Sequence, residues 1–108
     1  MGAGHCRDNL ERWYSSWYGT LPKDDCEAEC SAFGDGCVGY ETNSIGSWTC
    51  ALRFSKESTP DVSPSGSLQL FLPFDGVGPV KSSADSLTAI CYRKVQEQSG
   101  GGKHGFVD

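Results

Sequence analysis

Hydrophobic side chains near the start of the chain recur with the spacing of one face of an α-helix. They are Leu10, Trp13, Tyr14 and Trp17. The pattern predicts a helix over residues 8–18, with Asp8 as its N-cap and Gly19 at its end. Aromatic residues are also frequent in strands, so this segment could equally be extended or irregular.

A second helix is predicted over residues 24–33. Cys26, Cys30 and Phe33 share one of its faces, at positions i, i+4 and i+7. Asp24 is the expected N-cap, since a short acidic side chain can accept hydrogen bonds from the first N–H groups of a helix. The glycines that follow Phe33 are expected to end the helix.

Later segments alternate between hydrophobic and polar positions, which is typical of β-strands. Residues 37–42 and 48–54 predict a hairpin. One face of its second strand is expected to carry Trp48, Cys50, Leu52 and Phe54, and the other Thr49, Ala51 and Arg53. Residues 68–74 predict an edge or loop-packed strand, because Pro73 has no backbone N–H to pair on a second side. Residues 87–95 predict the last strand.

The chain has 108 residues, which suits one domain. Residues 1–5 are expected to be disordered, residues 6–95 to form the domain, and residues 96–108 to be a linker and tail. Residues 55–67 are rich in serine and proline, so they are expected to form a mobile surface loop. The domain is interpreted as one monomeric module of a larger protein.

The composition is poor in hydrophobic residues and rich in cysteine. Hydrophobic residues make up 37% of the chain, so the core is expected to be thin. Six cysteines in so short a chain predict a disulfide-stabilised protein that is secreted or on the cell surface. The net charge of −5 argues against nucleic acid as a partner. No run of 18 hydrophobic residues occurs, so no membrane insertion is expected.

Six cysteines allow fifteen pairings, and spacing alone does not choose among them. The predicted geometry narrows the choice. A helix that ends at Phe33 and then turns brings Cys37 back beside Cys30, and Cys26, one turn earlier, then meets Cys50 on the second strand of the hairpin. Cys6 and Cys91 remain, and they would join the two ends of the domain.

The same residues resemble a known family. The run Cys26-x3-Cys30-x6-Cys37-x2-Tyr40, the segment Trp48–Leu52 and the terminal cysteines are similar to a PAN/apple domain over Cys6 to about Val95. The resemblance implies an α+β fold in which a twisted antiparallel sheet cradles one helix. It also implies the three disulfides named above. The family usually begins with a strand, where the periodicity predicts the helix over 8–18.

Metal and catalytic sites are not expected. Cys26, Cys30, Cys37 and Cys50 could supply four zinc thiolates, but neither pair has the usual Cys-x2-Cys spacing and two cysteines would be left over. The acidic residues around Asp24 lack the alternate-position carboxylates of a calcium loop. His5 and His104 lie in segments expected to be frayed, where a general base would not be held near its proton. We therefore expect neither a cofactor nor enzyme activity.

Aromatic residues are the main hint of a binding surface. Trp and Tyr rings suit both sugar rings and protein interfaces. The candidate ligand-binding residues are Trp13, Tyr14, Trp17 and Tyr18. With an acidic chain, neutral glycans are favoured over polyanions such as heparin.

Three hypotheses follow for the function. The first is a carbohydrate-binding module that uses these aromatic residues. The second is a protein–protein interaction or adhesion module that binds an extracellular protein through the acidic helix or the 55–67 loop. The third is a spacer with no ligand.

Overall fold

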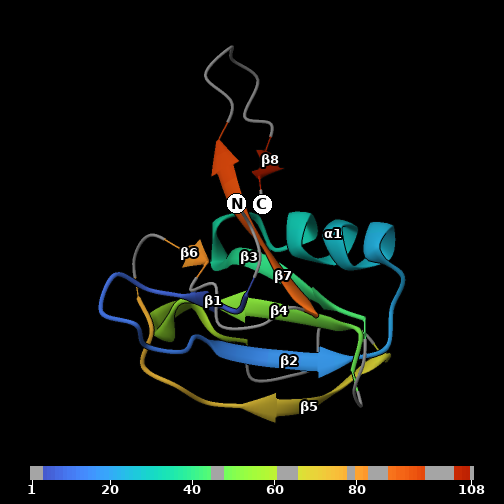
Figure 1. Cartoon of the computed structure of the whole chain (residues 1–108), viewed down its shortest axis with the longest axis horizontal. Helices are drawn as coiled ribbons and strands as arrows, with labels where there is room; N and C mark the ends of the chain where they lie inside the picture. Colours follow the sequence, from blue (N-terminus) through green and yellow to red (C-terminus); the bar gives the residue numbers. More distant parts are fainter. Residues whose placement is uncertain are drawn as a thin grey trace.

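The structure is a computed structural model that describes residues 4–44, 48–60, 66–77, 80–82, 88–96 and 104–107. Within these residues, six strands form the main antiparallel sheet, in the order β5-β2-β4-β3-β7-β8 (Figure 1). Its strands are β2 (Ser15–Gly19), β3 (Cys37–Asn43), β4 (Cys50–Phe54), β5 (Leu68–Leu72), β7 (Ala89–Gln96) and β8 (His104–Val107). The short strands β1 (Cys6–Arg7) and β6 (Lys81–Ser82) pair separately. The predicted α+β class, with one helix and an antiparallel sheet, is confirmed for these residues.

The helix α1 (Lys23–Ala32) confirms the prediction for this segment. Cys26 and Cys30 are buried on one face, and Phe33 packs against the same core. The predicted N-cap is wrong. Pro22 holds that position, because its carbonyl accepts the first intrahelical hydrogen bond from the N–H of Cys26, at 2.9 Å. Asp24 instead lies in the first turn, where a carboxylate favours the helix N-terminus.

Three disulfides join Cys6 to Cys91, Cys26 to Cys50 and Cys30 to Cys37, as predicted. Two of them attach α1 to the main sheet, one to β4 through Cys50 and one to the start of β3 through Cys37. The third joins β1 to β7 across 85 residues of sequence. Each bridge stabilises the fold by about 2–4 kcal/mol by restricting the unfolded chain, and the longest loop gives the most. Three disulfides in so small a domain are typical of extracellular proteins.

The helix predicted over residues 8–18 is wrong. Asp8 forms a tight turn, because its carboxylate accepts the backbone N–H groups of Leu10 and Arg12 at 2.9 and 2.8 Å. Residues from Ser15 onwards then enter β2, which pairs with β4 on one side and β5 on the other. The hydrophobic spacing of a helix arose here from side chains that belong to a turn and a strand.

The two faces of the main sheet have different surroundings. One face, which we call the helix face, carries Cys50, Leu52 and Phe54 and packs against α1. The opposite face, which we call the ion-pair face, carries Arg53, and the register places Ser16 beside it on β2. Glu41 on β3 belongs to the same face, since it pairs with Ala51.

The ends of the chain differ from the prediction. Gly4 and His5 are part of the fold, because the Gly4 N–H donates to the Ala89 carbonyl at 2.8 Å and His5 contacts Glu41. In the predicted tail, β8 pairs with β7. Within the predicted mobile loop, a short 3-10 helix spans Lys56–Ser58, and residues 61–65 lie outside the described residues. No helix in the described part of the chain is long and apolar enough to cross a membrane.

Candidate functional site

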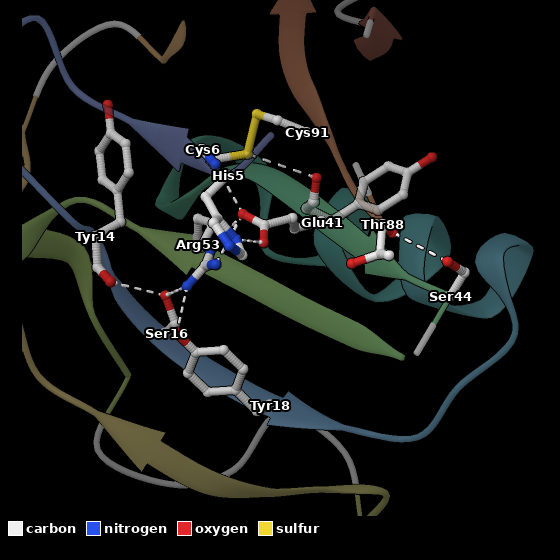
Figure 2. Close-up of polar contacts among 11 residues, drawn as sticks. His5, Cys6, Tyr14, Ser16, Tyr18, Glu41, Ser44, Arg53, Thr88 and Cys91 are labelled. Carbon is white, nitrogen blue, oxygen red and sulfur yellow. Dashed lines mark hydrogen bonds and ion pairs between the residues drawn. A yellow bond between two sulfur atoms is a disulfide. The ribbon is translucent and has the colours of Figure 1, made fainter. Parts of the chain in front are cut away.

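A fully buried ion pair lies at the centre of the ion-pair face (Figure 2). The Arg53 Nη2 atom donates to Glu41 Oε1 at 2.7 Å, and both side chains are inaccessible to solvent. Neighbouring positions of β3 and β4 bring the two residues together. A buried charge without a partner would be very unfavourable, so each residue depends on the other.

The Nη1 atom of the Arg53 guanidinium, which faces β2, also has its hydrogen-bond partners. It donates to Ser16 Oγ and to Tyr18 Oη, both at 2.6 Å. Burial alone would lower the pKa of Arg53, but the carboxylate of Glu41 raises it above its usual value. The guanidinium therefore stays charged and fixes the position of the Tyr18 hydroxyl.

The N-terminal segment covers the ion pair. His5 Nδ1 lies 2.5 Å from Glu41 Oε2, and the N–H of Cys6 donates to Glu41 Oε1 at 2.7 Å. Burial alone would raise the pKa of Glu41, but the charge of Arg53 and the hydrogen bonds from His5 and Cys6 hold it below its usual value. His5 was expected to lie in a frayed end; the structure places it over this carboxylate instead.

The turn at Asp8 forms the edge of the same cover. Burial alone would raise the pKa of Asp8, but the backbone N–H groups of Arg12 and Val77 and the Arg12 guanidinium hold it at about 2. Trp13 packs against His5, with ring centroids 4.8 Å apart, and the guanidinium of Arg53 lies 5.5 Å from its ring. Segments distant in sequence thus enclose the ion pair.

Beyond Tyr18 the ion-pair face opens into a hollow. Trp48 packs edge-on against the Tyr18 ring, with centroids 5.2 Å apart. The sequence predicted that Trp48 would share a face with Cys50, which is wrong for this side chain. Strand β4 begins only at Cys50, so the alternation does not extend back to Trp48.

The hollow has a volume of about 360 Å³ and is lined by uncharged residues. Besides the two aromatic residues they are Gly19, Thr20, Gly66, Ser67, Gln69 and Leu70. Gly19 is required here, because a Cβ atom at that position would lie 1.8 Å from the carbonyl oxygen of Ser67. An indole face with amide and hydroxyl groups around it can accept a small neutral, polyhydroxylated ligand.

The four predicted aromatic residues do not form one surface. Trp17 belongs to the core on the helix face, where it packs against Phe71. Tyr14 is fully buried, and burial raises the pKa of its hydroxyl. Trp13 is half-buried over the ion pair. Tyr18 is buried except where it lines the hollow.

Sequence reasoning missed the residues that complete this site. Trp48 was predicted to share a face with Cys50, and Gln69 and Ser67 were not considered. One signal for Trp48 was available in the sequence. Trp48 follows turn-forming residues and directly precedes a strand, and a ring at such a position can lie at the end of a sheet.

The residues considered for metals have other roles. All six cysteines are in disulfides, so none is a zinc thiolate. On α1, Asp24 and Asp25 are exposed, and Glu27 accepts a hydrogen bond from the Tyr40 hydroxyl at 2.8 Å. Among the described residues, no cluster of three or more His, Cys, Asp or Glu side chains is arranged for a metal ion.

Comparisons with known proteins gave no relative: no family model, curated protein or solved structure matches this chain.

Proposed function

We propose that this chain is an extracellular recognition module that binds a neutral carbohydrate in the hollow between Tyr18 and Trp48. The observation that carries the proposal is the lining of the hollow, which combines an indole ring with hydroxyl and amide groups and contains no charged residue. Sugar rings present apolar C–H faces and many hydroxyl groups, and this lining complements both.

In the proposed mechanism, the sugar ring stacks on Trp48. Tyr18 supports the indole from the side, and Arg53 fixes Tyr18 through its hydroxyl. Gln69, Ser67 and Thr20 would hydrogen-bond the sugar hydroxyls. The affinity of a single site of this size is expected to be weak and to become useful when several copies bind one glycan.

The cysteine spacing and the α+β architecture also support membership of the PAN/apple family, which we keep as part of this proposal. The three disulfides favour a secreted or cell-surface location. In that setting, the module would recognise glycans on behalf of a larger protein.

The test is a glycan array probed with the oxidised, biotinylated domain bound to streptavidin, so that weak sites act together. We expect binding to a coherent set of neutral glycans. Trp48→Ala should abolish the signal and Gln69→Ala should reduce it severalfold. Leu10→Ala is the matched control, because Leu10 is exposed and does not line the hollow.

Near-UV circular dichroism of each variant checks that the fold is intact. Unchanged glycan binding by folded Trp48→Ala would contradict this site. A blank array with folded wild-type protein would reject the carbohydrate proposal and favour the alternative, a protein–protein interaction module.

A further inference from the structure

A second hollow lies at the far end of β5 from the hollow between Tyr18 and Trp48. Its volume is about 530 Å³, which is within the range of small-molecule sites. Its walls come from the end of β5 and the residues after it, from the segment that follows β4, and from the start of β2. The two hollows share no lining residue, so they are separate sites.

Apolar rings form one part of the lining of the second hollow. They belong to Pro60, Phe71, Pro73 and Phe74. Trp17 of the core holds two of them, because it packs against Phe71 with ring centroids 5.0 Å apart and its Nε1 atom donates to the Pro60 carbonyl at 3.3 Å. Phe74 is 38% exposed, so apolar ring surface remains in contact with water. Such a lining favours a ligand with a flat or bulky apolar group, since binding removes both apolar surfaces from water.

A pair of opposite charges lies beside these rings. Lys56 Nζ is 3.2 Å from Asp75 Oδ1, and the two side chains are 64% and 71% exposed. An ammonium group has three N–H donors and a carboxylate has several acceptor sites, so each group can bind a ligand without breaking the pair. The second hollow therefore presents a donor and an acceptor of opposite charge, side by side, next to an apolar surface.

The backbone that carries the two charges is held in place. The N–H of Lys56 donates to the Gly76 carbonyl at 3.1 Å, and the N–H of Gly76 donates to the Trp13 carbonyl at 2.8 Å. Glycine is required at position 76, because a Cβ atom there would lie 2.7 Å from the Trp13 carbonyl oxygen. Asp75 directly precedes this anchored residue, so hydrogen bonds of the fold fix the spacing of the segments that carry the pair.

We propose that the second hollow binds a free α-amino acid with a large apolar side chain. The ligand carboxylate would accept a hydrogen bond from Lys56, its ammonium group would donate to Asp75, and its side chain would lie against the four rings. The two charged groups of an α-amino acid are attached to one carbon atom, so they are about as close together as the protein's own pair. The two pairs then lie side by side, with each charge next to its opposite.

The charges on the protein favour a zwitterion over other small ligands. An anion would be repelled by Asp75 and by the net charge of −5, and a cation would be repelled by Lys56. A neutral sugar would leave both charged groups without a charged partner. Because the pair is exposed, each charged contact is weak in water, and we expect a dissociation constant in the millimolar range.

The test is an amide NMR titration of the oxidised full chain with L-phenylalanine. We expect saturable shifts of the N–H signals of Lys56, Asp75 and Gly76. L-Phenylalanine amide lacks the carboxylate, N-acetyl-L-phenylalanine lacks the ammonium group, and each should bind about fivefold more weakly or worse. Glycine has both charges but no side chain, so it should also bind more weakly than L-phenylalanine.

Substitutions assign each ligand charge to its partner. Lys56→Gln and Asp75→Asn should each weaken the binding of L-phenylalanine about fivefold. Lys56→Gln should matter much less for L-phenylalanine amide, which has no carboxylate to lose its partner. Lys23→Gln is the matched control, because it removes the exposed Lys23–Glu27 pair of α1, 3.9 Å apart, and should leave the binding unchanged. Near-UV circular dichroism checks the fold of each variant.

Three outcomes would overturn the proposal. They are the absence of saturable shifts with L-phenylalanine, equal binding of L-phenylalanine and its amide, and unchanged binding by folded Lys56→Gln. Shifts confined to the hollow between Tyr18 and Trp48 would count as the first of these.

This proposal does not rest on the proposed function, and the two fail in different ways. Trp48→Ala should remove glycan binding and leave the binding of L-phenylalanine unchanged, because Trp48 does not line the second hollow. A blank glycan array would reject the carbohydrate site alone, and a flat titration with L-phenylalanine would reject the amino-acid site alone.

Discussion

The two faces of the main sheet are stabilised in different ways. On the helix face, hydrophobic side chains of β2, β3 and β4 pack against α1, and two disulfides join the layers. On the ion-pair face, the central buried group is a guanidinium that is bonded to Glu41, Ser16 and Tyr18. Leu52 and Arg53 are consecutive residues of β4, both fully buried, and they face these two environments.

This difference shows how a chain with few hydrophobic residues fills both sides of a sheet. Apolar packing tolerates small errors in geometry, whereas a buried ion pair is favourable only when every polar atom has a partner. The ion-pair face is therefore expected to be the more sensitive one to single polar substitutions. It is also the face that positions Tyr18 and, through it, the proposed binding site.

The largest expected effect comes from removing one partner of the ion pair. Arg53→Met keeps much of the side-chain volume but leaves Glu41 buried without its counter-charge, so we expect a loss of about 3–5 kcal/mol in the free energy of unfolding. Leu52→Ala, its neighbour on the helix face, should cost about 2–5 kcal/mol through the cavity it creates. Urea denaturation followed by tryptophan fluorescence measures both.

Adding Glu41→Gln to each of these variants separates the cost of an unpaired charge from the cost of lost packing. It should recover a large part of the loss in Arg53→Met, because it removes the unpaired charge, and it should give no recovery in Leu52→Ala. If Glu41→Gln fails to improve Arg53→Met, the cost comes from packing and the contrast between the faces is lost.

The helix face is also the one that the sequence predicted well. Alternation placed Cys50, Leu52 and Phe54 together, and helical spacing placed Cys26 and Cys30 opposite them. These predictions succeeded because the residues lie on α1 and the hairpin that closely follows it, and because disulfide geometry restricts the choice further.

The ion-pair face could not be predicted in the same way. Alternation correctly placed Arg53 away from Cys50, but it gave no sign that Arg53 would be buried. Its cover comes from residues 4–14, which contain β1 and the turn at Asp8, and the hydrophobic spacing favoured a helix from residue 8 onwards. The hollow was missed for a related reason, since Trp48 lies just outside the strand whose alternation was applied to it.

Acid should weaken the ion-pair face first. Glu41 and Asp8 both have a pKa below their ordinary values of 4.5 and 3.8, so the folded chain binds fewer protons in acid than the unfolded chain. Their contribution is present above about pH 4.5 and is lost as the pH falls from there towards 2. We expect the free energy of unfolding to fall over this range, which urea titrations at a series of pH values would measure.

Two variants test whether this acid dependence comes from the carboxylates of the ion-pair face. Asp8→Asn should make the fall in the free energy of unfolding shallower, because an amide binds no proton between pH 2 and pH 4.5. Asp25→Asn removes an exposed carboxylate in the first turn of α1 and should change the dependence much less. An equal effect of the two substitutions would show that the acid sensitivity reflects overall charge rather than the ion-pair face.

The smallest expected difference compares one substitution on the two faces. Tyr18→Phe leaves an N–H of the buried Arg53 guanidinium without a partner, and it should cost about 1.5–3 kcal/mol. Tyr40→Phe removes a hydrogen bond to Glu27, a half-buried carboxylate that can turn to water instead, so it should cost about 0.5–1.5 kcal/mol. Both variants keep the aromatic ring. If the slopes of their urea denaturation curves are equal, the difference in denaturation midpoint therefore reports the loss of the hydroxyl alone. Equal losses would mean that the guanidinium finds a replacement partner, such as water, and that the ion-pair face is less strictly arranged than its geometry implies.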